Sequence, residues 1–331
     1  MMNKRYIYPM LLFAVFYCLT VGLSGCISGN EDEYCGKTPV REPAFLTVTT
    51  RGIETDVPED GKWDNYVNSI RLIGFKDGEA PPSFNIVFTN GGDNKWTLVS
   101  ATEIVINTEI QAGQYAFYFI ANEGGHTLAG ENNILLKNKL DAISSQDELK
   151  GLTITYQAPE PEKPMLMTAV DNRMIWGGTT NNISVELIRT LSKLAGVQVV
   201  DKDDASCEGS FTLKLTGGNK FGLFVKTALG GTDYNKPKEI EGELATGPFL
   251  ENDDTADLTG YYFTESSKIE LVEVQLSDGT ESSPKEKEVI TVENRNTRVG
   301  VRAKLSEQEQ CLQINTLIAP WAPISLSPGY E

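Results

Sequence analysis

Apolar and polar residues alternate with a period of two along most of this chain. Successive residues of a β-strand point to opposite faces, so this period predicts strands rather than helices. The alternating runs are rich in β-branched and aromatic residues, and clusters of Gly, Asn, Asp and Pro separate them. In the first half they are TVTT (47–50), SIRLIGF (69–75), FNIVFTN (84–90), EIVINTEI (103–110) and QYAFYFIAN (114–122).

The run QYAFYFIAN is apolar on both of its faces. Tyr115, Phe117 and Phe119 share one face, and Tyr118 and Ile120 share the other. A strand that is covered on both sides loses the alternation that is typical of a half-exposed strand. We therefore predict that this strand lies in the interior of its sheet.

One stretch of the first half has the helical period instead. Residues 132–143, with the sequence NNILLKNKLDAI, place four apolar side chains along one stripe. These side chains are Leu135, Leu136, Leu140 and Ile143. The stripe predicts an amphipathic helix over this stretch, with its apolar face packed against the rest of the domain.

The second half of the chain begins its strand pattern at NISVELIRTLSKLAGVQVV (182–200). Ile183, Val185 and Leu187 alternate there as in a strand, although the centre of the run, residues 186–194, also fits a helix. Further runs with strand composition are FTLKLTG, YYFTE, KIELVEVQL, TVENRN, TRVGVRAKL and CLQINTLIAPW. Many short strands separated by turns predict an all-β fold, either a β-sandwich or an open barrel.

The size and charge of the chain limit the classes of function. Its 331 residues suffice for two domains, and the proline-rich segment APEPEKP (158–164) is a candidate boundary on composition alone. The formal net charge is −17 at pH 7. A surface this acidic repels phosphate backbones and anionic lipid, which argues against nucleic-acid binding.

The N-terminus has the parts of an exported precursor. A short basic region precedes an apolar stretch over residues 7–23, and small residues end it. The ending Leu23-Ser24-Gly25-Cys26 resembles the bacterial lipobox, in which the cysteine thiol receives a diacylglyceryl group. We therefore predict a signal peptide over residues 1–25 and acylation of Cys26. Incorporation of labelled palmitate is the expected sign of this acylation. An ordinary signal peptide with a chance cysteine is the alternative.

An acidic patch from Asn30 to Glu33 lies directly behind Cys26. Such a patch resembles the surface-export signal of some Gram-negative lipoproteins. It also fits a solvated, disordered tether, and the sequence leaves both interpretations open. The first interpretation predicts a precursor that is held on the cell surface by a lipid in the outer membrane.

Residues that carry most enzyme and metal chemistry are scarce. Cys35, Cys207 and Cys311 lack the CxxC spacing of metal sites. Cys207 and Cys311 either form a disulfide or remain two free thiols, and the sequence leaves both alternatives open. His126 is the only histidine, and its turn-like segment EGGHTLAG predicts a surface loop. Because no nucleophile elbow, phosphate-binding loop or HExxH motif occurs, we expect no enzyme activity, no cofactor and no metal.

Five segments of the chain, in this order, carry a resemblance to a known family. They are QAGQYAFYFIANEGG (111–125), PMLMTAV (164–170), ISVELIRTLSKLAGVQV (183–199), VENRNTRVGVRAKL (292–305) and CLQINTLIAPW (311–321). Together they resemble the fimbrillins, the type V pilins of Gram-negative gut and oral bacteria. Arg189 and Lys193 fit a basic position of the third segment, whereas Val299 stands where the family commonly has an aromatic residue. The match is spread over most of the mature chain.

The resemblance implies two tandem β-sandwich domains of transthyretin-like topology. Its divisions are a signal peptide (1–25), an acidic tether with the first strand as propeptide (26–51), an N-terminal sandwich (52–177) and a C-terminal sandwich (178–331) with a donor-strand tail from about 311 to 331. PMLMTAV belongs to the first domain in the family. The implied boundary therefore falls near residue 178 rather than at the proline-rich segment.

Family members reach the outer membrane as lipoproteins, and a surface protease then cuts after an arginine behind the first strand. Here the first strand is expected from Ala44 to Thr50, so the resemblance implies a cut between Arg51 and Gly52. Arg41 competes as a site, but a cut there leaves the strand attached. The apolar side chains that we expect to lose burial are Phe45, Leu46 and Val48. The emptied groove then takes up a strand from another subunit.

The C-terminal segment offers a strand for such an exchange. Because prolines interrupt it after residue 319, we expect residues 311–319 to complete the chain's own domain and Ile324 and Leu326 to enter a neighbour. The implied function is a structural subunit of a cell-surface fimbria that supports adhesion and biofilm formation. Its implied partners are other copies, minor pilus subunits and an arginine-specific surface protease. Alternatives are a non-polymerising anchor or tip subunit and a surface glycan-binding lipoprotein.

Overall fold

The computed structural model of the protein describes twelve ranges of residues. They are 43–51, 66–77, 79–100, 103–130, 133–156, 164–217, 220–224, 238–246, 262–265, 267–284, 289–305 and 311–320. Cys26, Gly52, Ile324 and Leu326, for which the sequence predicts roles, lie outside these ranges, as does Arg41.

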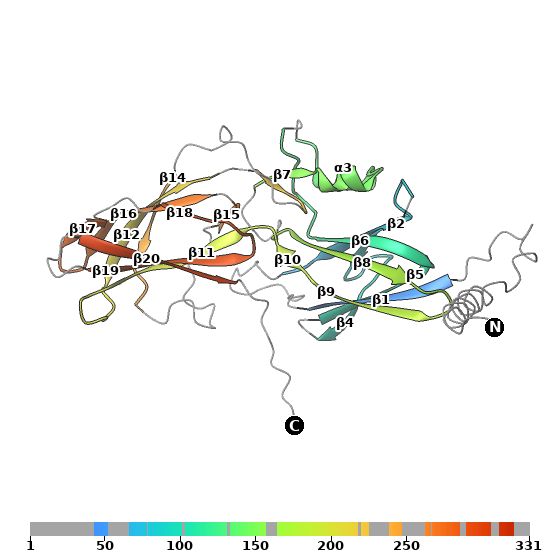
Figure 1. Ribbon diagram of the computed structural model, residues 1–331, viewed down its shortest axis with the longest axis horizontal. Coiled ribbons are helices and arrows are strands. Elements are labelled where there is room, and N and C mark those ends of the chain that lie inside the picture. The colour runs from blue at the N-terminus through green and yellow to red at the C-terminus, as the bar shows by residue number, and fades with distance from the viewer. Residues whose placement is uncertain are drawn as a thin grey trace, which may run out of the picture. The chain divides into compact units, whose positions relative to one another are not determined.

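A four-stranded sheet contains the first strand of the chain as an interior member. Its order is β4-β5-β1-β9. The strands are β1 (Pro43–Arg51), β4 (Thr97–Ser100), β5 (Glu103–Gln111) and β9 (Thr180–Glu186). β1 is antiparallel to β5 and parallel to β9, so segments far apart in the sequence lie side by side (Figure 1).

A five-stranded sheet faces the first one, in the order β10-β8-β6-β2-β3. Its strands are β2 (Ser69–Lys76), β3 (Phe84–Thr89), β6 (Gly113–Ala121), β8 (Met167–Ile175) and β10 (Ile188–Arg189). β6 lies between β2 and β8 and pairs antiparallel with both. The prediction that QYAFYFIAN forms an interior strand is therefore confirmed.

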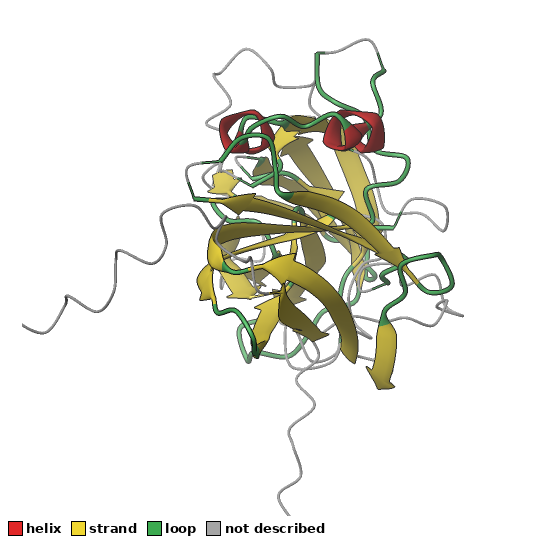
Figure 2. Cartoon of the chain, turned by 90° about the vertical axis from the view of Figure 1, so that its right-hand side faces the viewer, coloured by secondary structure: helices red, strands yellow, loops and turns green. Residues whose placement is uncertain are grey.

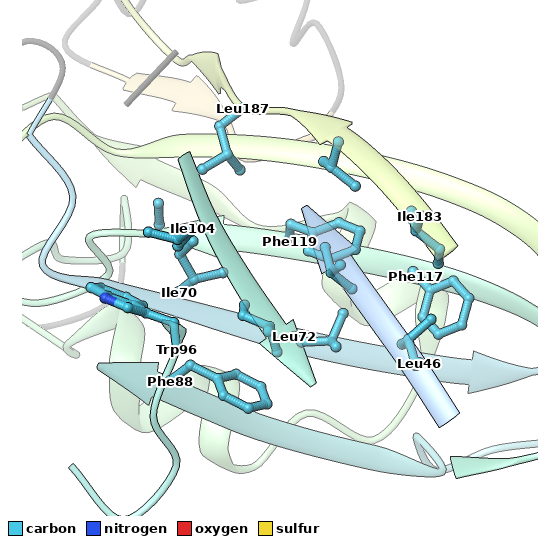
Figure 3. Packing of buried hydrophobic residues seen from close by; sticks show 14 of the residues in the cluster. Leu46, Ile70, Leu72, Phe88, Trp96, Ile104, Phe117, Phe119, Ile183 and Leu187 are labelled. Atoms are coloured by element: carbon cyan, nitrogen blue, oxygen red, sulfur yellow. The ribbon is translucent and has the colours of Figure 1, made fainter. Parts of the chain in front are cut away.

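The two sheets share one layer of buried apolar side chains, which we call the first core. Leu46, Ile104 and Ile183 reach it from the four-stranded sheet, and Leu72 and Phe117 reach it from the five-stranded sheet (Figure 3). Two sheets that pack face to face over such a layer form a β-sandwich. The predicted all-β sandwich fold is confirmed.

The outer face of the five-stranded sheet carries a second apolar layer, which we call the helical layer. It consists of α2 (Leu136–Asp141), α3 (Gln146–Lys150), β7 (Thr153–Thr155) and β13 (Lys220–Gly222). Tyr118 and Ile120 of β6 pack there against Leu140 of α2 and Phe221 of β13. Figure 2 shows the two helices, in red, next to each other on one side of the strands.

The helix predicted over residues 132–143 is shorter in the structure. Asn133 has a left-handed φ of 53°, and Leu135 has an extended backbone that forms an isolated bridge with Thr127. α2 therefore begins only at Leu136. Three of the four predicted apolar side chains are buried, whereas Leu135 is 43% exposed.

His126 is buried, and the prediction of a surface loop is wrong. Its carbonyl oxygen accepts a hydrogen bond of 2.8 Å from the backbone N–H of Leu136, and its Nε2 lies 3.3 Å from the carbonyl oxygen of Pro164. The neighbouring Gly124 and Gly125 are exposed and form the turn that the sequence indicates. Contact with the start of α2, which no local pattern shows, buries the histidine.

A buried arginine fixes the helical layer to the sheet. Arg71 of β2 is 2% exposed and donates hydrogen bonds to both carboxylate oxygens of Glu123 and, at 2.7 Å, to Asp141 at the end of α2. Burial lowers the pKa of Arg71, but the bonds and charges of Glu123 and Asp141 outweigh it and raise the pKa above its ordinary value. The guanidinium therefore stays charged and links the sheet to the helix.

Residues 220–224 connect the two halves of the chain. β13 pairs antiparallel with β7, and the ring of Phe224 meets Tyr118 edge-on at a centroid distance of 4.9 Å. Arg295 donates hydrogen bonds of 3.0 and 3.1 Å to the carbonyl oxygens of Gly222 and Leu223. These contacts hold a segment of the second half against the helical layer.

The second half forms a nine-stranded sheet, ordered β14-β12-β16-β17-β20-β19-β11-β15, with β18 paired to β16. Its strands are β11 (Ser192–Val200), β12 (Gly209–Thr216), β14 (Lys238–Glu243), β15 (Tyr262–Phe263), β16 (Lys268–Leu276), β17 (Glu281–Pro284), β18 (Val289–Thr291), β19 (Thr297–Leu305) and β20 (Cys311–Pro320). Val197, Phe211, Leu271 and Val299 belong to its second core. Residues 186–194 contain strand rather than the helix that was the alternative.

Each core draws on its own part of the sequence. Ile183, Val185 and Leu187 are buried in the first core, and Leu194 is the first residue of the second core. The predicted alternation of these three apolar residues is confirmed. The domain division near residue 178 stays a prediction. β9, which follows that position in the sequence, contributes its buried side chains to the first core.

β20 completes the second sheet of the same chain. It pairs antiparallel with β19 from Leu312 to Pro320, and Leu312 is buried in the second core. The prediction that residues 311–319 serve the chain's own domain is confirmed. Cys207 is a half-buried free thiol, and burial together with the carboxylates of Asp201 and Asp278 raises its pKa.

Substitution of Arg71 by Met tests the buried ion pair. It leaves the carboxylate of Glu123 buried without its charged partner, so we expect a loss of about 3–5 kcal/mol in the free energy of unfolding. Urea denaturation followed by circular dichroism measures the loss. Lys304→Met removes an exposed ion pair with Asp204 and is expected to change the stability little. Equal effects of the two substitutions would contradict the assignment.

Candidate functional site

The position of β1 in its sheet is the feature that the predicted maturation would change. β1 has hydrogen-bonded neighbours on both sides, in register with Glu103–Gln111 of β5 and with Thr180–Glu186 of β9. β5 and β9 do not pair with each other in the described residues. The strand therefore fills a slot that is one strand wide.

The inward face of β1 contributes three fully buried side chains to the first core. Ala44, Leu46 and Val48 are each 0% exposed. Val48 lies between Ile106 of β5 and Ile183 of β9 in the strand register. Figure 3 shows Leu46 on its strand, directed into the cluster with the residues of both sheets.

The prediction for the buried residues of this strand is right for Leu46 and Val48 and wrong for Phe45. Phe45 is 55% exposed, and Ala44 takes the buried position instead. Because side chains of a strand alternate between faces, Phe45 cannot join Leu46 in the core. The large aromatic ring lies on the outward face, opposite Glu109 and Thr180.

Asn181 fixes the start of β1, and sequence reasoning missed it. Its amide donates to the carbonyl oxygen of Trp176 at 3.0 Å and accepts from the backbone N–H of the same residue at 2.9 Å. The backbone N–H of Phe45 donates to Thr179 at 3.2 Å. The turn between β8 and β9 therefore holds the first residues of β1. An asparagine in the polar run TTNN (179–182) was the available signal.

Arg51 is the last residue of β1 rather than the first residue behind it. The register pairs it with Glu103 of β5 and with Glu186 of β9. The strand that the sequence predicts to end at Thr50 is thus one residue longer. Cys26, Gly52, Ile324 and Leu326 lie outside the described residues, so cleavage at Gly52, lipidation and donation stay predictions.

Removal of β1 would open both an apolar and a polar vacancy. Burial of each large apolar side chain contributes about 1.5–3 kcal/mol. The free energy of unfolding of a whole domain is about 5–15 kcal/mol, so the loss of Leu46 and Val48 would remove a substantial part of it. The facing edges of β5 and β9 would also lose the hydrogen bonds that β1 makes with them. Unpaired edges of this kind accept a further strand.

The described ranges also bear on metal binding and membrane insertion. No group of three or more His, Cys, Asp and Glu side chains there is placed to hold a metal ion. None of the helices in those ranges is both long and apolar enough to cross a membrane.

Solved structures with a similar fold include fimbrial and cell adhesion proteins. The tip fimbrial protein Mfa3 of Porphyromonas gingivalis, solved with a C-terminal truncation, matches with a TM-score of 0.55 at 13% identity, over 84% of this chain and 100% of that chain. A candidate cell adhesion protein of Parabacteroides distasonis matches with a TM-score of 0.50 at 15% identity, over 86% of this chain and 100% of its own.

A second candidate cell adhesion protein of Parabacteroides distasonis matches with a TM-score of 0.52 at 10% identity, over 86% of this chain and 98% of that chain. No family model and no curated protein sequence matches this chain. At these identities the likeness establishes a shared fold. The all-β architecture that the sequence predicts is thus the fold of proteins described as fimbrial or adhesive.

Substitution of Leu46 by Ala tests which face of β1 enters the core. We expect a loss of about 2–5 kcal/mol in the free energy of unfolding, because a fully buried side chain is truncated. Phe45→Ala in the same strand is expected to cost less than about 1 kcal/mol, since that ring is exposed. Urea denaturation of both variants gives the comparison. A larger effect at Phe45 would reverse the assignment of the two faces.

Proposed function

We propose that this chain is a structural subunit of a cell-surface fimbria, exported as a lipoprotein, cut after Arg51 and joined to other subunits by strand exchange. In this proposal Cys26 carries the lipid that holds the precursor in the outer membrane. The subunit supports adhesion and biofilm formation, is not an enzyme and uses no cofactor. Its partners are other copies, minor pilus subunits and an arginine-specific surface protease.

The single observation that carries the proposal is the end of β1 at an arginine. A cut behind Arg51 removes the whole strand, together with the buried Ala44, Leu46 and Val48. A cut behind Arg41 would leave every residue of β1 in the chain. Only the first of these two cuts converts a complete sandwich into an acceptor for a strand.

The sheet order gives a second reason for exchange. β1 is an interior strand, so its loss separates β5 from β9 instead of shortening an edge. Such a gap is filled by a strand that pairs on both sides, which supplies more hydrogen bonds than addition to one edge. Ile324 and Leu326 are the residues proposed to fill the corresponding gap of a neighbouring subunit.

A tip subunit that does not polymerise is the second candidate. The similarity to the tip fimbrial protein Mfa3, with a TM-score of 0.55, favours it. A tip subunit would still be cut and would still accept a strand, but it would donate none. The C-terminal segment around Ile324 and Leu326 therefore separates the two candidates.

Substitution of Arg51 by Ala tests the cleavage site. We expect the surface protein to keep its N-terminal segment and to form no fibres, because β1 stays in its slot. N-terminal sequencing of protein shed from the cells reads the result. The unsubstituted chain should begin at Gly52, and Arg41→Ala is the matched control with normal processing. An acylated start at Cys26 in the unsubstituted chain would instead indicate an anchor subunit.

Substitution of Ile324 and Leu326 by Asp tests donation. Two charged side chains do not fit an apolar groove, so we expect loss of fibres while the monomer keeps its stability. Electron microscopy of cells and urea denaturation of purified protein give the two readouts. Ser325→Asp and Ser327→Asp, on the alternate face, form the matched control. Normal fibres from the Ile324 and Leu326 variant would support the tip subunit.

A further inference from the structure

We propose that Glu103 and Glu186 select the strand that replaces β1, by favouring one with Lys or Arg at the register position of Arg51. This inference rests on the proposed function, because it concerns the strand that enters after β1 has left. It names the chemistry of that strand, which the apolar groove alone does not define.

The strand register brings the two glutamates to one position on the outward face. Glu103 of β5 and Glu186 of β9 are the cross-strand neighbours of Arg51, one on each side. Directly opposed residues of neighbouring strands share a face, and opposite charges there stabilise the pairing. Glu103 is half-buried and Glu186 is exposed. In the uncut chain a basic residue thus occupies a position flanked by two acidic residues.

Cleavage behind Arg51 changes the charge of this position as well as emptying the groove. The arginine leaves with β1, whereas Glu103 and Glu186 belong to strands that stay. Two strands separated by one vacant position are about 10 Å apart, so the carboxylates then face each other across a gap without the cation. The end of the groove at which β1 finished becomes acidic.

The polar positions also define the register of an incoming strand. A shift by one residue turns apolar side chains to the wrong face, but a shift by two restores the alternation. Apolar pockets alone therefore discriminate poorly between registers two residues apart. The outward neighbours differ along the groove: Thr47 binds Asn107 through a hydrogen bond of 2.9 Å, and the Arg51 position lies between the two glutamates.

Charge complementarity identifies the class of donor. Residues 311–331 of this chain contain no Lys or Arg, so a strand taken from that segment of a second copy brings no cation to the glutamates. A strand from a different subunit, with a basic residue at this position, would bring a cation to Glu103 and Glu186. We therefore assign the groove of this chain to a strand from a different subunit, such as a minor pilus subunit, while the chain's own tail remains the proposed donor to a neighbour; a second copy's tail in this groove becomes the competing outcome of the test.

A competition experiment on the cut protein tests the selection. The full chain with Cys26→Ala is cut by an arginine-specific protease, and its new start at Gly52 is verified. Three labelled peptides are then compared: residues 43–51, the same peptide with Arg51→Glu, and residues 322–331. Fluorescence anisotropy gives their dissociation constants. We expect the Arg51→Glu peptide to bind about 2–30-fold more weakly than the native peptide, with the difference shrinking in high salt.

Acceptor variants decide whether the glutamates cause the difference. With Glu103→Gln and Glu186→Gln together, the two peptides should bind equally. Glu109→Gln is the matched control, because Glu109 lies on the same face of β5 but opposite Phe45, and there the difference should persist. Equal binding of the two peptides to the unsubstituted acceptor, or binding of residues 322–331 as tight as that of the native peptide, would overturn the inference.

A double-mutant cycle on the uncut chain keeps this test independent of strand exchange. Arg51→Gln is combined with Glu103→Gln and Glu186→Gln, and the unfolding equilibrium constants are compared. We expect the effects to be non-additive, whereas additive effects would refute the pairing even if no peptide entered the groove. Failure of every peptide to bind, with coupling intact, would instead count against the proposed exchange.

Discussion

The two-sided pairing of β1 is the constraint on which the first sandwich depends. β5 and β9 reach the same sheet only because β1 lies between them, antiparallel to one and parallel to the other. The same strand supplies Leu46 and Val48 to the first core. Main-chain pairing and apolar burial thus rest on one segment near the start of the described chain.

The helical layer is held to the five-stranded sheet by contacts in which β1 takes no part. Arg71, Glu123 and Asp141 join the five-stranded sheet to α2 on its outer face. Residues 220–224 add a strand and Phe221 to the same layer. These contacts lie on the face of the five-stranded sheet that is turned away from β1. The five-stranded sheet therefore keeps one covered face whether or not β1 is present, which provides a stable platform beside the groove.

Local pattern accounts for most of the fold but not for the site. The period of two identifies the strands, and two apolar faces identify β6 as interior, because both signals are contained in one short segment. The burial of Ala44 instead of Phe45 depends on the register of β1 with β5 and β9, which are far away in sequence. The burial of His126, whose carbonyl oxygen accepts a hydrogen bond from the first residue of α2, likewise depends on contacts outside its own segment. The position of Arg51 between two glutamates likewise needs three distant segments in register.

The geometry of the β1 slot also has a mechanical consequence. Hydrogen bonds run across the strand axis in both ladders of β1, perpendicular in the antiparallel ladder with β5 and slanted in the parallel ladder with β9. A force that pulls along a strand seated between β5 and β9 therefore loads the hydrogen bonds of both ladders in shear at the same time. The strand then does not leave by breaking its hydrogen bonds one after another from an end. A tether that enters the molecule through this slot would resist pulling better than one attached at the sheet edge formed by β4.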